Sequence, residues 1–459
     1  MHLNRTDKPL PKDEISFSLP EIEKFNLENG LQVLSIQKNK LPIVRLNLIV
    51  NAGSKFDPEN KKGLSNLFAM TIDEGAGEYS SLELNEEFNF LGTNFGVSAN
   101  QDRVHLSLQS LTENFDRSLE LFSLIVNQPH FSGEDFLRQQ RKILTHLLQL
   151  KDDPEEIADT VFSYKVFDKD NLYAFPINGY ESDVKNISAA DIKNHYENYF
   201  TPVNSTLVVV SNLKKDELTE KLNNRLRGWN TNAVTSELNF NSFQNKRQIF
   251  LVDKKNSVQS EIRIGHLSSP RTQEEFFNKL VLNTILGGPF TSRINLNLRE
   301  KKGYTYGASS NFGYYENAGF FYVSTSVGIE NTSNAVKEIL FELENIKAGV
   351  TAEELEFARS FLIRKFPSNF ETYSQLASSL TSIAAFGLPD NYFNTYIDNV
   401  KKVSIEDVNS AAVQNIFPEE LIIVIVGDKE TLLPQLQKEL KEEIFLTDYS
   451  GNSITTDID

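Results

Sequence analysis

The chain carries the same order of sequence landmarks twice, and this internal duplication constrains its fold more than any other feature. The first copy opens at residues 24–34 with a hairpin pattern around an Asn-Gly turn, and an apolar strand pattern follows at 43–50. The second copy opens with alternating apolar residues at 247–252 and 261–266. In each copy a loop containing Gly or Pro then leads into a helical pattern, at 63–72 and at about 274–286.

Later landmarks repeat in the same order. Ser132 and Thr351 each precede acidic residues and a long helical pattern, which makes both of them candidate N-caps. Towards the end of each half, an apolar strand pattern follows a helical one, at 205–210 and 421–426. Because strands and helices do not alternate strictly, we predict an α+β fold with two homologous halves. Each half is expected to be an antiparallel-dominated sheet with helices packed on one face, and the halves face each other across a cleft.

The duplication also sets the expected domain boundaries. A stretch rich in Asn, Thr and Ser separates the two copies and has the composition of a linker. We expect five segments, which are an N-terminal extension at 1–19, a first half at 20–225, a linker at 226–245, a second half at 246–440 and a C-terminal tail at 441–459.

Composition argues against several classes of function. The formal net charge is -17 and no long run of Lys or Arg occurs, which disfavours nucleic-acid binding. The chain has no cysteine, so disulfides and Cys-ligated metal centres are excluded. No apolar stretch is long enough to cross a bilayer, so we expect no membrane span. Residues 1–15 lack the apolar core of a signal peptide, so we expect a cytoplasmic protein; a periplasmic one would need a signal removed beforehand.

The residues that usually carry catalysis are dispersed. The chain has six histidines. No two of them are three or four residues apart, so no pair shares a helical face for a metal. The sequence also lacks a G-x-S-x-G elbow, a P-loop and a dinucleotide-binding fingerprint. An autonomous hydrolase therefore has no supporting motif.

Residues 63–70 read Gly-Leu-Ser-Asn-Leu-Phe-Ala-Met, which resembles the active-site helix of the pitrilysin/insulinase zinc metallopeptidases. This family, the inverzincins, has relatives that include the mitochondrial processing peptidase. Its members carry H-x-x-E-H there: two histidines on one helical face bind zinc, and the glutamate acts as the general base. At those three positions this chain has Asn66, Ala69 and Met70. The family's third ligand is a glutamate on a later helix, and the resemblance places His146 at or next to that position.

The resemblance therefore implies the framework of the family without its metal site. We expect no metal in this chain and no peptidase activity from this chain alone. His146 is the one remaining candidate ligand, but a catalytic zinc needs three protein ligands. We interpret His146 as an ordinary histidine on a partly buried helix.

The second half contains a motif that matches the family more closely than the first-half helix does. Residues 286–293 read Leu-Gly-Gly-Pro-Phe-Thr-Ser-Arg and residues 298–306 read Leu-Arg-Glu-Lys-Lys-Gly-Tyr-Thr-Tyr, which resembles the family's C-terminal signature. The resemblance implies that Arg299 and Tyr306 lean across the cleft toward a zinc site in the facing half or subunit. A guanidinium can clamp a peptide carbonyl or carboxylate, and a phenol can donate to the oxyanion formed when water attacks the scissile carbonyl.

Two alternatives to this interpretation of the motif stay open. Tyr304 competes with Tyr306 for the role, although Tyr306 matches the family spacing better. If the motif is only structural, the two tyrosines alternate on a strand and Arg299 pairs with an acid such as Glu300. Residues 309–317 then predict a strand and turn, and an edge strand there would offer an extended peptide a place to bind by β-augmentation.

The resemblance also implies a division of labour between two chains. In some members of the family, one subunit brings the zinc helix and the other brings the Arg/Tyr motif. We therefore expect a non-catalytic subunit of a heterodimeric zinc endopeptidase, with a homologous zinc-bearing partner subunit and a peptide substrate. Zinc, the only cofactor, is expected in that partner. The rival is a structural or assembly protein of the same fold, as family-like core subunits of a respiratory complex are, which would have no reason to keep both Arg299 and Tyr306.

Overall fold

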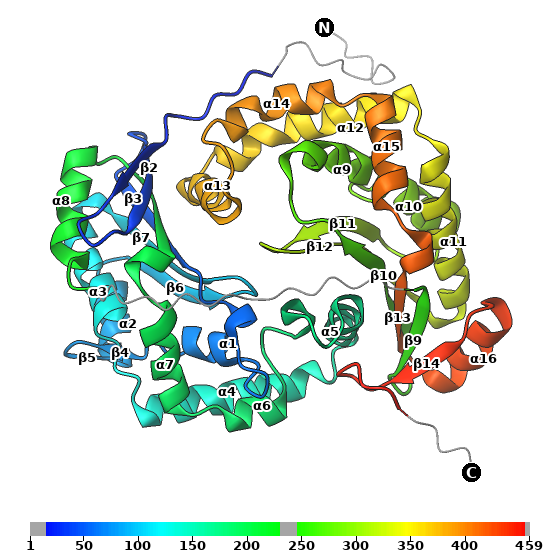
Figure 1. Ribbon diagram of the computed structural model, residues 1–459, viewed down its shortest axis with the longest axis horizontal. Coiled ribbons are helices and arrows are strands. Elements are labelled where there is room, and N and C mark those ends of the chain that lie inside the picture. Colours follow the sequence, from blue (N-terminus) through cyan, green and yellow to red (C-terminus); the bar gives the residue numbers. More distant parts are fainter. Residues whose placement is uncertain (1–14, 230–245, 455–459) are drawn as a thin grey trace, which may run out of the picture.

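Two six-stranded sheets, one in each half of the chain, form the framework of the protein in the computed structural model, which describes residues 15–229 and 246–454 (Figure 1). The first sheet has the strand order β1-β2-β8-β3-β7-β6 and the second has the order β14-β9-β13-β10-β12-β11. Apart from the outermost strands β1 and β14, strands at the same place in the two sheets come from the same place in the two sequence copies. The predicted pair of homologous α+β halves is therefore confirmed.

Short strands build both sheets. The first sheet consists of β1 (Glu23–Asn26), β2 (Gln32–Gln37), β3 (Ile43–Val50), β6 (Asn94–Ala99), β7 (Val104–Leu111) and β8 (Ser205–Ser211). The second consists of β9 (Gln248–Asp253), β10 (Gln259–Ser268), β11 (Ala308–Tyr314), β12 (Gly319–Gly328), β13 (Ile422–Gly427) and β14 (Ile444–Thr447). A separate two-stranded sheet pairs β4 (Gly75–Ala76) with β5 (Tyr79–Ser80).

Most neighbouring strands are antiparallel, as predicted. The parallel pairs in the two large sheets are β2 with β8, β9 with β13, and β9 with β14. Strand β14 lies in the segment that we expected to be a C-terminal tail, and it extends the second sheet at the edge next to β9. Strands β6 and β11 form the opposite edges of the two sheets. Most of the expected N-terminal extension and linker lie outside the described residues.

Helices fill the rest of both halves. The first half contains α1 (Leu64–Ala69), α2 (Ser81–Phe90), α3 (Phe115–Asn127), α4 (Gly133–Leu150), α5 (Pro154–Phe167), α6 (Glu181–Asn186), α7 (Ala189–Tyr199) and α8 (Lys215–Leu226). The second contains α9 (Gln273–Leu286), α10 (Arg293–Asn295), α11 (Thr332–Asn345), α12 (Ala352–Lys365), α13 (Tyr373–Phe386), α14 (Tyr392–Lys402), α15 (Ile405–Asn415) and α16 (Lys429–Glu439). Ser132 and Thr351 cap α4 and α12 through their side chains, as predicted.

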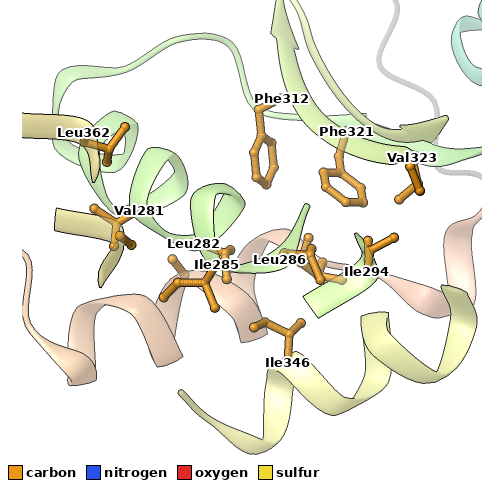
Figure 2. Close-up of a cluster of buried hydrophobic side chains, with 14 of the residues drawn as sticks. Val281, Leu282, Ile285, Leu286, Ile294, Phe312, Phe321, Val323, Ile346 and Leu362 are labelled. Carbon is orange, nitrogen blue, oxygen red and sulfur yellow. The ribbon is translucent and has the colours of Figure 1, made fainter. Parts of the chain in front are cut away.

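One face of each sheet packs on helices of its own half. Figure 2 shows this core in the second half, where α9 places Val281, Leu282, Ile285 and Leu286 near Phe312, Phe321 and Val323 of the sheet. All of these side chains are buried. Along β12, Phe321 and Val323 alternate with partly exposed residues that face the other side of the sheet. This layer is the arrangement that the sequence predicts.

The other face of each sheet packs on a helix from the opposite half. Helix α5, from the first half, places Ile157, Val161 and Phe162 in one buried cluster with Phe250 and Val424 of the second sheet. Helix α13, from the second half, lies against β3 and β8 of the first sheet. Both helices lie between the two sheets in Figure 1. The sequence does not reveal this exchange, which places two helices where we expected a cleft between the halves.

A charged cluster joins the halves next to α13. The Lys55 ammonium lies 3.3 Å from the Asp102 carboxylate and 2.5 Å from that of Glu316, which comes from the second half. The backbone N–H of Glu316 donates to Asp102 (2.9 Å), and the Tyr173 hydroxyl donates to the same carboxylate (2.7 Å). The Lys55 side chain is only 2% exposed and that of Asp102 8%, so their charges depend on one another for stabilisation.

Along the described ranges of the chain, no helix is both long and apolar enough to cross a membrane. Its helices instead combine buried and exposed faces, as in α4, where Phe136, Ile143 and Leu147 are buried and the residues between them are mostly exposed.

Lys55→Ala should lower the free energy of unfolding by about 3 kcal/mol at pH 7, because it leaves the buried Asp102 carboxylate without its nearest buried cation. As a control, Lys193→Ala removes only an exposed ion pair with Glu197 and should change stability by less than about 0.5 kcal/mol. Urea unfolding followed by circular dichroism measures both variants. A loss below about 1 kcal/mol for Lys55→Ala would contradict a stabilising role for the cluster.

Candidate functional site

Helix α1, which resembles a zinc-binding helix, is fixed at its start by the buried carboxylate of Asp57. This carboxylate accepts hydrogen bonds from the backbone N–H groups of Gly63 and Ser65, both at 2.9 Å, and from the Ser65 hydroxyl at 2.5 Å. Gly63 has a φ of 98°, and a Cβ there would lie 2.7 Å from the Asn178 carbonyl oxygen, so glycine is required. Burial raises the pKa of Asp57 to about 7. These contacts fix the first turn of α1.

The side chains at the family's metal positions do not fit a zinc ion. The Asn66 amide donates a hydrogen bond to the side-chain oxygen of Asn178 (2.9 Å). Ala69 offers only a buried methyl group, and the half-buried Met70 packs against the first-half core. His146 lies on the exposed face of α4, a partly buried helix as we predicted. Within residues 15–229 and 246–454, no group of three or more His, Asp or Glu side chains is arranged to hold a metal.

Two other histidines, His195 and His266, form hydrogen bonds with backbone groups. His195 donates from Nε2 to the Ala52 carbonyl (3.0 Å). His266 accepts a hydrogen bond at Nε2 from the Phe417 N–H (3.2 Å), so Nδ1 carries the proton that it donates to the Leu267 carbonyl (2.7 Å). Burial lowers the pKa of both His195 and His266 to about 4. Both rings are therefore neutral and structural at neutral pH.

A pocket of about 750 Å³ opens beside the metal positions. Its walls include Asn178, which holds Asn66, and Leu147, which follows His146 on α4. The remaining walls come from α5, the segment 175–182 and a turn near the C-terminus at 449–452. The degenerate metal positions of the first half thus border a sizeable concave surface.

Arg299 lies in a wide helical turn, a π-helix at Leu296–Lys301 that follows α10. The carbon of its guanidinium is 4.7 Å from the centre of the Phe290 ring, a cation–π contact. Its Nη1 lies 3.5 Å from the Glu300 carboxylate, and the side chain is still 39% exposed. The pairing with Glu300 expected from a purely structural motif is therefore present but long, and the guanidinium is accessible.

The two tyrosines of the motif lie in different environments. Tyr304 is partly buried against the second-half core, whereas Tyr306 is 94% exposed. Between them, the Thr305 hydroxyl donates to the Gly307 carbonyl (2.8 Å) and accepts from the Thr325 hydroxyl of β12 (3.1 Å). Tyr306 forms no hydrogen bond within the part of the chain that the structure describes. The segment is thus held on both sides of Tyr306, which alone projects into solvent.

The Gly-Gly-Pro loop places one more aromatic residue at this site. The Ser310 N–H donates to the Gly287 carbonyl (3.0 Å), and a Cβ on Gly287 would lie 2.3 Å from the Ser310 hydroxyl oxygen, so the close approach requires glycine. The side-chain amide of Asn295 donates a hydrogen bond to the Ala308 carbonyl and accepts one from the Ala308 N–H (3.0 Å). The loop therefore carries Phe290 next to Arg299. The sequence did not point to Phe290, although an aromatic residue directly after Gly-Gly-Pro was the available signal.

A groove of about 580 Å³ lies beside this motif. Phe290 and Phe361 are among its walls, and hydroxyl groups from the strands β11 and β12 line it at Ser309, Ser324 and Ser326. Strand β11, whose outer edge carries no neighbouring strand in the described sheet, runs along it. This groove shares no lining residue with the pocket beside α1. The groove is therefore lined by Phe290, which contacts Arg299, and by Gly307, which follows Tyr306, and it lies apart from the pocket beside the metal positions of the first half.

Comparison with known families identifies the fold. Residues 32–173 match the family described as insulinase (peptidase family M16), and residues 186–362 match the peptidase M16 inactive domain. The two matches together cover most of the chain. The chain therefore belongs to peptidase family M16, and the inactive-domain match runs from the end of the first half into the second.

The names of the chain's relatives describe different functions. A non-peptidase homologue, YmxG of Helicobacter pylori, is 24% identical over 402 residues, which is 87% of this chain and 92% of that protein. Subunit 1 of the mitochondrial cytochrome b-c1 complex of Caenorhabditis elegans is 20% identical over 442 residues, 91% of this chain and 90% of that protein. A probable mitochondrial-processing peptidase subunit beta of Arabidopsis thaliana is 20% identical over 210 residues, 45% of this chain and 38% of that protein.

A solved structure has the same fold. The peptidase M16 inactive domain protein from Pseudomonas fluorescens superimposes with a TM-score of 0.84 at 22% identity, covering 89% of this chain and 98% of that chain. This similarity confirms the two-halved architecture.

Restoring three ligands should create a zinc site if α1 and α4 have the family's arrangement. We expect the triple variant Asn66→His/Met70→His/His146→Glu to bind about one zinc per chain, because two histidines on one helical face and a carboxylate complete a three-ligand set. The variant Asn66→His/Met70→His/His146→Ala serves as the control, because it leaves only two ligands, and it should bind zinc at least about tenfold more weakly. Metal analysis after dialysis measures the zinc content. Equal zinc binding in the variants with His146→Glu and His146→Ala would show that residue 146 is not at the third position.

The contribution of His266 to stability should fall as the pH drops below 6.5. Because the folded-state pKa of His266 is about 4, below the ordinary 6.5, the unfolded chain takes up this proton first. The stabilisation is therefore complete above pH 6.5 and is lost as the pH falls toward 4. His266→Gln should reduce the loss of unfolding free energy between pH 6.5 and 5 by about 1.5 kcal/mol, measured by urea unfolding at each pH. Parallel pH profiles for the variant and the parent chain would refute this assignment.

Proposed function

We propose that this M16 member is the non-catalytic subunit of a heterodimeric zinc endopeptidase. In this proposal its second half supplies Arg299 and Tyr306 to the active site of a homologous, zinc-bearing partner subunit. The observation that carries the proposal is the presentation of Tyr306, which is 94% exposed while its neighbours in the chain are fixed. The Arg299 side chain of the same motif is also accessible. A large aromatic side chain held outward in this way gains no folding energy from its own chain, which favours a role in binding another molecule.

The chemistry of the two side chains fits cleavage of a peptide bond. The partner would supply the zinc and the general base that activates water. Arg299 would bind a carbonyl or carboxylate of the peptide, and Phe290 holds its guanidinium in place by the cation–π contact. Tyr306 would donate its hydroxyl proton in a hydrogen bond to the oxygen of the scissile carbonyl as negative charge develops there.

The surroundings of the motif offer a place for the rest of the peptide. The groove beside Phe290 presents the hydroxyls of Ser309, Ser324 and Ser326, which can bind backbone groups of an extended chain. Strand β11 forms one wall and an edge of the second sheet, so a peptide could also pair with it by β-augmentation. Peptides and unfolded segments are the substrates that such a surface would accept.

A second chain is needed for this function because the chain's own metal positions hold Asn66, Ala69 and Met70. The relative named as a mitochondrial-processing peptidase subunit beta is a peptidase subunit by its name, which supports a two-subunit arrangement for this chain. Zinc is therefore assigned to the partner in this proposal.

The alternative is a structural or assembly protein of the same fold. It is favoured by one finding, the match over 91% of the chain to a subunit of the cytochrome b-c1 complex. Under this alternative, Arg299 and Tyr306 would contact a neighbouring protein and no peptide bond would be cleaved.

Substitutions at the motif distinguish the two functions. With the chain purified together with a zinc-bearing homologue from the same organism, Tyr306→Phe should lower kcat for an unstructured peptide about 100-fold, because one donor to the developing charge is lost. Arg299→Ala should lower kcat/KM by about 10- to 100-fold. Tyr304→Phe is the matched control, two residues away and partly buried, and should leave turnover within about twofold.

Size-exclusion chromatography should show that the pair stays associated in all three variants. Unchanged turnover in both Tyr306→Phe and Arg299→Ala would favour the structural alternative. Chelator-sensitive cleavage by this chain without any partner would refute the proposal.

A further inference from the structure

The pocket beside α1 is assembled from distant parts of the chain. Leu147, Thr160 and Tyr180 come from the first half, whereas Tyr449 and Asn452 come from the C-terminal turn after β14. At about 750 Å³ it has the size of pockets that hold small organic molecules or peptide side chains. It contains no residue of the Arg299–Tyr306 motif, so its occupant does not follow from the function proposed above.

The C-terminal turn forms one wall of this pocket, and hydrogen bonds within the turn fix its shape. The Asp448 carboxylate accepts hydrogen bonds from the backbone N–H groups of Ser450 (2.9 Å) and Asn452 (2.8 Å), which closes the turn. Gly451 has a φ of 89° and lies so close to Tyr164 that a Cβ would come within 2.6 Å of the ring. The turn is therefore shaped to fit against α5.

Aromatic rings dominate the apolar part of the pocket. Tyr164 and Phe175 meet edge to face with ring centres 6.3 Å apart, and Phe175 and Tyr180 do the same at the same distance. Tyr449 adds a fourth ring from the C-terminal turn, and the Lys151 ammonium lies 5.1 Å from its centre. A ligand that enters the pocket thus meets ring edges and faces on several sides, which favours an aromatic group.

The charges around the pocket are largely neutralised within the protein. Glu181 pairs with Lys151 at 2.7 Å and with Lys185 at 2.8 Å. Asp159 pairs with Arg263 at 2.5 Å. Glu156 also lines the pocket, but its side chain is exposed to solvent. An uncharged ligand fits such walls better than a charged one, because the paired groups have no surplus charge to offer it.

Hydroxyl groups without partners supply the polar contacts. Thr160 and Ser163 lie one turn apart on α5 and both line the pocket, and neither hydroxyl forms a hydrogen bond within the described residues. The Tyr180 hydroxyl is buried without a hydrogen-bond partner in that same part of the chain. Such groups are stabilised by an incoming acceptor, and peptide carbonyls are acceptors of this kind.

We propose that this pocket binds an aromatic side chain of a peptide, with the flanking peptide carbonyls accepting hydrogen bonds from the hydroxyls of Thr160 and Ser163. The first half would then be a peptide-binding module that keeps a ligand site after losing the metal ligands. The C-terminal turn completes this site from the far end of the chain.

The test uses the full chain and N-acetyl-4-fluorophenylalanine amide as the probe, followed by fluorine NMR. We expect saturable binding that Ser163→Trp weakens at least about tenfold by filling the pocket, and that Tyr449→Ala weakens about threefold or more by removing one ring. Tyr449→Ala keeps the test valid if Ser163→Trp does not fold. Asn224→Trp is the matched control: it lies in a separate surface groove beside α3 and α8 and should bind the probe as the parent chain does.

Competition defines the ligand class. Unlabelled N-acetylphenylalanine amide should displace the probe, whereas N-acetyllysine amide and inorganic phosphate should not. The proposal is overturned if the parent chain shows no saturable binding, or if the folded pocket variants bind as well as Asn224→Trp does. Stronger displacement by N-acetyllysine amide would overturn it too, since the exposed Glu156 would then determine the ligand.

Discussion

The packing of α5 on the second sheet and of α13 on the first is the contact on which the rest of the structure depends. In the second sheet it places the apolar side chains of Val161 and Phe162 in one buried cluster with Phe250 and Val424. In the first sheet it joins Asn47 and Gln109 to α13 by hydrogen bonds. It also positions both candidate sites, because α5 contributes Glu155 to the groove near Arg299 and Thr160 to the pocket beside α1. A shift of α5 would therefore change both concave surfaces together.

The parts of the fold that follow from local rules were predictable. The hairpin turn at Asn29-Gly30, the strand at 43–50 and the caps at Ser132 and Thr351 all depend on neighbouring residues, and the structure confirms them. The helix exchange could not be predicted, because the apolar pattern of α5 shows that one face is buried and not which sheet buries it. Strand β14 was missed since its four residues gain their order from β9, far away in the sequence.

The candidate site also combines residues that the local sequence identifies with residues that only the tertiary structure brings to it. The resemblance to the family's C-terminal signature singled out Arg299 and Tyr306, and the structure places Tyr304 partly buried against the core and Tyr306 in solvent. Phe290 was not predicted, because its contact with Arg299 depends on how the Gly-Gly-Pro loop folds back against β11. The pocket beside α1 lay beyond sequence analysis for a similar reason: its walls come from segments as distant as α4 and the turn at 449–452.

The helix exchange has a consequence for how the chain folds during its synthesis on the ribosome. The last strand of the first sheet, β8, ends at Ser211, but α13, which covers β3 and β8, begins only at Tyr373. While the chain between them is being synthesised, the nascent first half exposes Val208 and Val210 of β8, which in the complete protein are buried in a cluster with second-half residues. Such surfaces are prone to aggregation. We therefore expect the nascent first half to need protection from aggregation during translation, and truncated chains that end before α13 to accumulate in aggregates.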